Sequence, residues 1–218
     1  MNKYKLSDIA KSVNGELYGN DITVSNFSID SRTIKKDDVF ICIIGKKYDS
    51  HNFISDCADK ASCLIISKEI IDKNLDKIPY ILVKDTLKAL HDLSRFVRSR
   101  SKAKFIAITG SNGKTTVKEM IAHILSDYKI CYTKDNFNNH IGVPLTLLSM
   151  NQDENYVIIE VGANNLGEIR PLANIINPDV AAVTNIGYAH IEGFKSLDNT
   201  AKEKYSIFDY VKKDGFSV

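Results

Sequence analysis

Residues 106–120, IAITGSNGKTTVKEM, have the residue types and spacing of a loop that binds phosphate. Glycines permit backbone conformations closed to other residues, so that N–H groups of residues 111–115 can point at phosphate oxygens. The lysine would neutralise the β and γ phosphates, and a threonine hydroxyl can ligate Mg²⁺. We therefore predict a phosphate cradle formed by Thr109, Gly110, Ser111, Asn112, Gly113, Lys114, Thr115 and Thr116.

The loop departs from the usual pattern G-x-x-x-x-G-K-[ST] at one position. Gly113, Lys114 and Thr115 match, but Ile108 stands where the first glycine belongs, and the chain turns at Gly110 instead. The alternative interpretation is a glycine-rich turn with an exposed lysine. The position of the loop between an apolar run and a helix-like stretch favours nucleotide binding.

Two further side chains could complete such a site. Glu160 ends the apolar run YVIIE, where it could hold Mg²⁺ as the second acidic group that such sites use. The alternative is a strand-end glutamate that faces water. His190 ends the run NIGYAH and could add an imidazole ligand, although a lone loop histidine is usually only solvated.

The elements that must position these groups alternate between strand and helix from residue 104 onward. Several strands are continuous apolar runs, which is typical of parallel sheets covered by helices on both faces. We predict a mainly parallel, doubly wound α/β sheet with Thr109, Glu160 and Asn185 at the carboxyl ends of its strands, where ligands bind. The predicted strands are 105–109, 130–132, 156–161 and 180–185, and the predicted helices are 115–126, 144–150, 168–176 and 197–211.

The first part of the chain differs in texture. Residues 1–84 predict a small α/β domain, with strands at 24–29, 39–43, 63–66 and 80–83 and a helix at 52–60. Leucines at helical spacing predict a connecting helix in residues 85–103, and residues 104–218 form the second domain.

Composition excludes several classes of protein. The net charge of +2 over 218 residues, with basic and acidic residues interspersed, argues against a nucleic-acid partner. No apolar run approaches the roughly 18 residues that span a bilayer. The N-terminus lacks the apolar core of a signal peptide. We therefore expect a cytoplasmic protein without membrane insertion.

Four stretches together resemble one family, the Mur ligases of bacterial cell-wall synthesis, over nearly the whole chain. Three resemble the branch that adds D-alanyl-D-alanine to a UDP-N-acetylmuramoyl tripeptide, and in one of them Asn138 is implied as an ATP-binding residue. The four stretches are TGSNGKTT, KDNFNNHIGVPLTLL, EVGANNLGEI and NIGYAHIEGFKSLDNTAKEKYSIF.

The first domain contributes to the resemblance through IDSRTIKKDDVFICIIGKKYDSHNF, which is similar to the family's uridine-nucleotide domain. It implies that Ser31 and Arg32 contact the UDP-sugar substrate and that His51 belongs to the same site. Without the resemblance, Asp-Ser-Arg is only a turn with an exposed arginine. His140 and Asn165 depart from the residues common in this branch.

The resemblance implies an ATP-dependent amide ligase that works through an acyl phosphate. Lys114 and Mg²⁺ would hold the γ-phosphate, Thr115 and Glu160 would bind one metal ion, and His190 would help bind a second.

The family also uses a lysine, often carbamylated, to bridge toward the metals. Lys202 and Lys204 compete for this role, and the spacing to the following Ile-Phe pair favours Lys204.

Members of the family have three domains and about twice this length. We therefore expect the chain to be an N-terminal portion that lacks the C-terminal ligase domain, with a further strand beginning near Val218. Such a portion would bind the UDP-sugar, and ATP weakly, without completing the ligation. The alternatives are another Mur-type or folylpolyglutamate-type ligase and a non-catalytic nucleotide-binding module.

Overall fold

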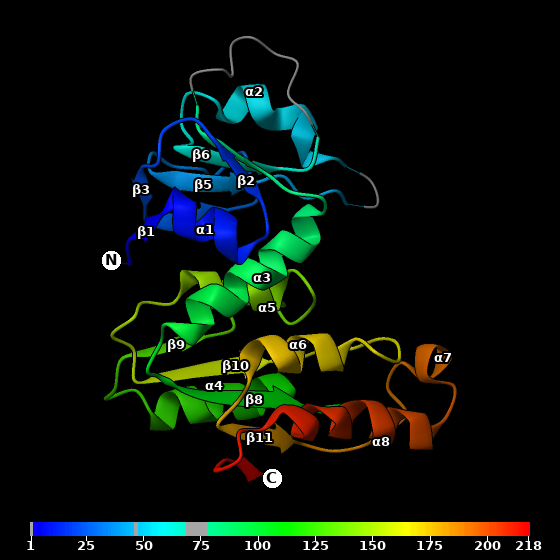
Figure 1. Cartoon of the computed structure of the whole chain (residues 1–218). Helices are drawn as coiled ribbons and strands as arrows, with labels where there is room; N and C mark the ends of the chain where they lie inside the picture. The colour runs from blue at the N-terminus through cyan, green and yellow to red at the C-terminus, as the bar shows by residue number, and fades with distance from the viewer. Residues whose placement is uncertain (1, 46–47, 69–77) are drawn as a thin grey trace. The chain divides into compact units, whose positions relative to one another are not determined.

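The computed structural model describes residues 2–45, 48–68 and 78–218. The chain divides into two compact units, Met1–Phe96 and Val97–Val218, which are described separately (Figure 1). The predicted division at residues 84 and 104 stays a prediction about domains. Helix α3, Thr86–Ser99, carries the chain from one unit into the other.

The first unit contains a five-stranded sheet in the order β2-β7-β6-β5-β4. Strands β4, β5, β6 and β7 are parallel to one another. Strand β2, at one edge of the sheet, pairs antiparallel with β7. A second, two-stranded sheet joins β1 and β3. The strands are β1 Tyr4–Lys5, β2 Glu16–Tyr18, β3 Thr23–Val24, β4 Asn26–Ser28, β5 Asp38–Ile41, β6 Cys63–Ile66 and β7 Tyr80–Leu82.

Two elements of this unit differ from the prediction. The single strand expected at 24–29 is two strands that belong to different sheets. Thr23–Val24 pairs with β1, and Asn26–Ser28 pairs with β5. The helix expected at 52–60 is a 3₁₀ turn, Ser50–Phe53, followed by one α-helical turn, α2, Ile54–Cys57. Helix α1, near the start of the chain, is Leu6–Ser12.

The second unit is built on a wholly parallel five-stranded sheet in the order β12-β11-β8-β10-β9. The predicted α/β fold with a parallel sheet is therefore confirmed. A strand does begin near the last residue, where β12 pairs with β11. The strands are β8 Lys104–Thr109, β9 Ile130–Tyr132, β10 Tyr156–Glu160, β11 Val180–Val183 and β12 Phe216–Ser217.

Helices cover both faces of this sheet. Ile108 and Ile158 pack with Ala122 of α4 on one face. The alternate residue Phe105 points to the other face, where the Arg98 guanidinium lies 3.6 Å from its ring centroid and donates to the Ile176 carbonyl at the end of α6. The helices are α4 Lys114–Ile124, α5 Gly142–Ser149, α6 Ile169–Ile176, α7 Ile191–Phe194 and α8 Leu197–Tyr205.

The helix predicted at 197–211 ends earlier, and a 3₁₀ helix, Ser206–Tyr210, follows α8. Sequence reasoning missed α7, because a single helical turn has too few residues to show periodicity. None of the helices in the described part of the chain combines the length and the hydropathy that a bilayer crossing requires.

Asp179 ties the amino-terminal ends of the sheet together. Its carboxylate accepts hydrogen bonds from the Phe105 backbone N–H (2.9 Å) and from the ammonium groups of Lys104 (3.1 Å) and Lys212 (2.9 Å). Burial raises the pKa of Asp179, but these three donors outweigh it and hold the pKa below its ordinary value. Asp179 thus joins the start of β8 to the segment that leads into β12.

Candidate nucleotide and metal site

The loop between β8 and α4 depends on two glycines with positive φ. Gly110 has φ +151°, and a Cβ at this position would overlap the Thr184 hydroxyl, so the close approach of the two segments excludes any larger residue. Gly113 has φ +78° and is the N-cap of α4. Its left-handed conformation turns the chain from the loop into the helix.

The loop is supported from the segment that follows β11. Asn185 accepts two backbone hydrogen bonds, from Ser111 N–H to its carbonyl (3.0 Å) and from Asn112 N–H to its side-chain oxygen (2.9 Å). The Thr184 hydroxyl donates to the Asn112 carbonyl (2.6 Å), and the Ser111 hydroxyl accepts from the Gly187 N–H (2.8 Å). The predicted meeting of the ends of β8 and β11 is therefore seen directly.

This support leaves fewer backbone N–H groups available to bind phosphate than the sequence predicted. The N–H groups of Ser111 and Asn112 point to Asn185 and not into an open cradle. The N–H groups of the first turn of α4 have no acceptor within the helix, as at every helix N-terminus, and they carry its positive dipole end. A phosphate would therefore meet the first turn of α4, beginning at Lys114.

Lys114 and Thr109 lie on either side of the loop. The Lys114 ammonium folds back to donate to the Gly110 carbonyl (2.9 Å) and is partly buried. The Thr109 hydroxyl is fully buried, and no partner for it is found among the described residues. The Lys114 ammonium is thus in contact with the backbone of the loop.

Glu160 is the central acidic group of the site. It is 3% exposed, and its two carboxylate oxygens accept separate hydrogen bonds, one from the Thr115 hydroxyl (2.8 Å) and one from the Asn138 amide (2.8 Å). Both donors are neutral. A buried anion is costly without a compensating positive charge, and the oxygens of a carboxylate and a hydroxyl are ligands that Mg²⁺ prefers. The donor set therefore fits a hard divalent cation.

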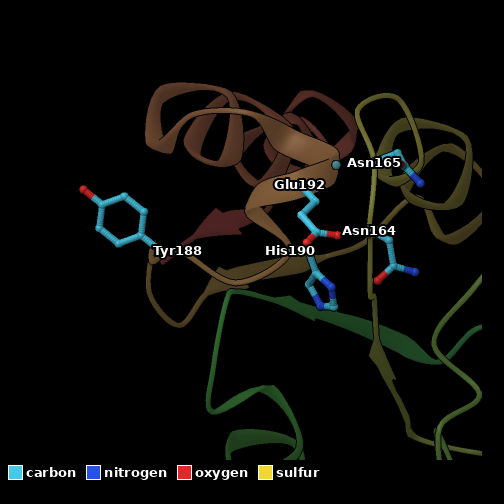
Figure 2. Close-up of a pocket in the computed structure, with 6 residues that line it drawn as sticks. Asn164, Asn165, Tyr188, His190 and Glu192 are labelled. Atoms are coloured by element: carbon cyan, nitrogen blue, oxygen red, sulfur yellow. The ribbon is translucent and has the colours of Figure 1, made fainter.

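His190 lies in the segment between β11 and α7. It has φ +56° and lines an open hollow of about 550 Å³ (Figure 2). In Figure 2 His190, Glu192 and Asn164, which line the same hollow, project toward one another, and Tyr188 points away from them. Within the described residues, no group of three or more His, Cys, Asp or Glu side chains is gathered to bind a metal ion.

Phe194 links His190 to Lys204. The Phe194 ring meets the His190 ring edge-on, with 6.5 Å between centroids, and the Lys204 ammonium lies 5.5 Å from the Phe194 centroid. Lys204 is 1% exposed, whereas Lys202 is exposed. Burial lowers the pKa of Lys204 to about 8, with a further contribution from the charge of Lys114. Lys204 is thus the lysine of the pair that lies inside the unit.

Glu203, next to Lys204, was not singled out from the sequence. Its buried carboxylate accepts hydrogen bonds from the N–H groups of Gly167 (2.7 Å) and Ile169 (2.7 Å), at the start of α6. It therefore caps α6 and fixes α8 against it. Its position in a charged stretch, KEKY, resembles any solvated helix face, and no local signal distinguishes it.

The three residues predicted to contact a UDP-sugar lie in the first unit. The Arg32 side chain is 85% exposed and binds Asp30 through two nitrogens (2.9 and 2.6 Å), which lowers the pKa of Asp30 to about 2. Ser31, between them, is half-buried.

His51 is held from both sides. Its Nδ1 lies 2.6 Å from the Asp49 carboxylate, and its Nε2 accepts from the Ser67 N–H (3.0 Å). Both ring nitrogens are therefore engaged within the protein, and the ring orders the turn in which it lies.

A parallel sheet whose strand–loop–helix unit places a lysine and a buried carboxylate at the carboxyl ends of the strands defines a P-loop type of α/β protein. Comparison with known families narrows this class. Residues 108–218, more than half of the chain, match the Mur ligase middle domain. The chain belongs to the Mur ligase family.

Individual relatives agree with this assignment. The UDP-N-acetylmuramoyl-tripeptide–D-alanyl-D-alanine ligase of Buchnera aphidicola is 43% identical over 208 residues, covering 95% of this chain and 45% of the relative. A crystal structure of MurF from Acinetobacter baumannii has a TM-score of 0.93 at 31% identity and covers 100% of this chain and 48% of that one. MurF from Thermotoga maritima in complex with ADP has a TM-score of 0.80 at 28% identity, over 89% of this chain and 45% of that one. The chain thus spans about half the length of the relatives it matches.

Proposed function

We propose that the chain binds ATP with Mg²⁺ in its second unit and a UDP-N-acetylmuramoyl tripeptide in its first, as part of a ligase that joins the tripeptide to D-alanyl-D-alanine. One observation carries the proposal. A buried carboxylate, Glu160, is bonded to the hydroxyl of Thr115 in the first turn of the helix that follows the loop. The Thermotoga maritima relative, whose structure is a complex with ADP, supports an adenine nucleotide as the ligand.

In this proposal the phosphates of ATP bind where the loop meets α4. The first-turn N–H groups and the dipole of α4 attract the phosphates. The Lys114 ammonium leaves the Gly110 carbonyl and pairs with the β- and γ-phosphates, so that ADP keeps one of its two contacts. Asn138 contacts the nucleotide from the loop that precedes α5.

Thr115 and Glu160 would ligate the Mg²⁺ ion, which neutralises charge on the transferred phosphoryl group when it is bound. One carboxylate oxygen already accepts a hydrogen bond from the threonine hydroxyl. The two side chains are therefore adjacent, and little rearrangement is needed for both to bind the same cation. His190 would help to bind a second ion from the hollow beside Glu192.

The reaction proposed is phosphoryl transfer followed by amide formation. The carboxylate of the peptide takes the γ-phosphoryl group of ATP and becomes an acyl phosphate, with release of ADP. The amine of D-alanyl-D-alanine then attacks the acyl carbon, loses a proton and displaces phosphate. The task of the protein is to position and neutralise charge, which is the main contribution in phosphoryl transfer.

Lys204 is the proposed site of carbamylation. Its buried position and a pKa lowered to about 8 favour the neutral amine, which is the form that reacts with CO₂. The product is an anionic carbamate, able to face metal ions as the ammonium cannot.

In the first unit, Ser31 and Arg32 would bind the UDP-sugar. The exposed Arg32 guanidinium can exchange Asp30 for a diphosphate without loss of a buried contact. His51, with both nitrogens engaged, is proposed to order this site. The proposal also places the protein in the cytoplasm, where ATP is available.

The direct test is calorimetric titration of the 218-residue chain with ADP in the presence of Mg²⁺. We expect binding that Lys114→Ala weakens at least about tenfold, the effect of losing a charge-assisted bond. Lys213→Ala, which removes an exposed lysine of the same unit, is the matched control and should bind as the wild type does. Equal ADP affinity for both variants would rule the loop out as the nucleotide site.

The substrate half has its own test. UDP-N-acetylmuramoyl tripeptide should raise the melting temperature of the wild type, and Arg32→Ala should abolish the increase while leaving ADP binding unchanged. A chain that responds to ADP and not to the UDP-linked peptide would contradict the assignment of the first unit.

A further inference from the structure

Lys118 is a lysine in the interior of the second unit. It lies on α4 one turn beyond Thr115, and its side chain is 2% exposed. Its ammonium donates to the Thr133 carbonyl (2.7 Å), pairs with the Glu119 carboxylate (2.8 Å) and lies 5.5 Å from the centroid of the Tyr132 ring. An ammonium this deeply buried is costly unless its partners are well placed, so its location is specified by the fold.

Thr133, whose carbonyl accepts the hydrogen bond from Lys118, also bonds to β10 through its N–H and its hydroxyl. Thr133 is 0% exposed and follows directly on β9. Its N–H donates to the Ile158 carbonyl (3.0 Å), and its hydroxyl accepts from the Glu160 N–H (3.0 Å). These bonds extend the pairing of β9 with β10 by one residue. Lys118 therefore holds the residue that fixes the backbone of Glu160.

The same segment leads to the second partner of the carboxylate. Five residues after Thr133, Asn138 donates its amide to Glu160 and accepts the Gly162 N–H at its carbonyl (2.8 Å). Thr115 and Lys118, three residues apart, share one face of α4. Thr115 donates a hydrogen bond to the Glu160 carboxylate. Lys118 donates a hydrogen bond to Thr133, which lies at the end of β9, where the loop that contains Asn138 begins.

We propose that Lys118 is a positioning residue, whose buried ammonium locks the end of β9 to α4 and so holds Glu160 and Asn138 in the arrangement that receives the cation of the nucleotide. The cation in this statement rests on the proposed function. The locking itself does not, because every contact that produces it lies within the protein. Lys118 is too buried to touch a ligand, which separates its role from that of the partly exposed Lys114.

The locking is tested first without any ligand, by amide hydrogen exchange with mass spectrometry on the 218-residue chain. Lys118→Met keeps the apolar stem and removes the donor. We expect exchange in peptides covering 133–142 and 160–163 to rise about tenfold, and peptides covering 169–176 and 180–183 to be unchanged. A rise of similar size in all four regions, or no rise in the first two, would overturn the proposal.

Glu119→Gln is the matched control. It removes the exposed carboxylate, 56% exposed, that pairs with Lys118 but leaves the bond to Thr133 in place. Its exchange should match the wild type. If it reproduces the pattern of Lys118→Met, the ion pair with Glu119 and not the bond to Thr133 carries the effect, and the proposal fails.

The consequence for the site is tested by the ratio of the ADP dissociation constants measured without and with Mg²⁺. Lys118→Met should reduce this ratio about tenfold and leave the affinity without metal nearly unchanged, since Lys118 does not contact the phosphates. Thr133→Val, which removes the hydroxyl that binds the Glu160 N–H and keeps the branched shape, should do the same. If Lys118→Met does not fold, Lys118→Leu, which also removes the ammonium that binds the Thr133 carbonyl, carries both tests. Variants that retain the wild-type ratio overturn the proposal.

The two failures are distinguishable. A wild-type chain that binds ADP no better with Mg²⁺ contradicts the proposed function, while the exchange experiment still decides whether Lys118 locks β9 to α4. A wild type with a clear Mg²⁺ effect that the variants share contradicts the positioning role alone.

Discussion

The hydroxyl of Thr115 donates to the carboxylate of Glu160 over 2.8 Å, and the two residues are 45 positions apart in the sequence. One belongs to the first turn of α4 and the other ends β10. The parallel sheet brings them together, because the carboxyl ends of β8 and β10 lie at the same edge. This bond joins the loop that would bind phosphate to the acid that would bind its cation.

Glu160→Gln should separate metal binding from folding. The glutamine keeps the shape of the side chain, and the Thr115 hydroxyl can reverse its role and accept a hydrogen bond. We therefore expect the free energy of unfolding without metal to change by less than about 1 kcal/mol. The gain in ADP affinity on adding Mg²⁺ should be lost. Chemical denaturation and calorimetry measure the two quantities, and a variant that keeps the Mg²⁺ effect would remove Glu160 from the proposed site.

Gly110→Ala should destabilise the second unit by about 3 kcal/mol, because the new methyl group overlaps the Thr184 hydroxyl and the backbone is left-handed. Gly167→Ala is the matched control. Gly167 also has a positive φ, +87°, but a Cβ there meets no atom within 4 Å, so only the backbone cost of about 1 kcal/mol remains. Urea denaturation compares the two, and equal losses would show that the overlap at Gly110 is relieved.

Carbamylation of Lys204 should be visible as a ¹³C carbamate resonance when the chain is equilibrated with ¹³C-labelled bicarbonate near pH 8. Neutral amine becomes abundant as the pH approaches the lowered pKa of about 8, whereas the exposed Lys202 has no comparable burial. The resonance should disappear in Lys204→Ala and persist in Lys202→Ala. The reverse pattern would assign the carbamate to Lys202.

Asp179→Asn should change how stability depends on acid. The carboxylate has a pKa held below its ordinary value of 3.8, so its contribution to stability is complete above that pH and is lost as the pH falls through the folded-state pKa. At pH 7 the variant should be about 2 kcal/mol less stable, since one charged group serves three donors.

The difference in the free energy of unfolding between wild type and Asp179→Asn should shrink steadily below about pH 4. Urea denaturation at pH 7, 5, 4 and 3 measures it. A difference that stays constant over this range would show that the carboxylate does not titrate as its contacts indicate.

The second unit was the more predictable from sequence, for a physical reason. Strands β8 and β10 are buried on both faces, so they appear as continuous apolar runs, and the loop between strand and helix has its own glycine pattern. The expectation that Glu160 would lie near the loop followed from the shared edge of a parallel sheet.

Other features depend on partners far along the chain and leave no local pattern. The burial of Lys118 requires a carbonyl 15 residues away, and the support of the loop by Asn185 spans 73 residues. The contacts that hold the His51 ring, with the Asp49 carboxylate and the Ser67 N–H, could not be read from its turn. The short strands β1 and β3 have two residues each, too few for any periodicity.

The loop between β8 and α4 does not stand by itself, since Thr184, Asn185 and Gly187 supply much of its support. Transplanting residues 109–116 into another strand–helix junction would carry over the glycines and the lysine. It would leave out the supporting segment 184–187, which supplies these hydrogen bonds. In this protein the supporting segment 184–187 lies a few residues before His190 along the chain. Residues 109–116 and 184–187 therefore form one structural unit, and any design that reuses the loop has to include both segments.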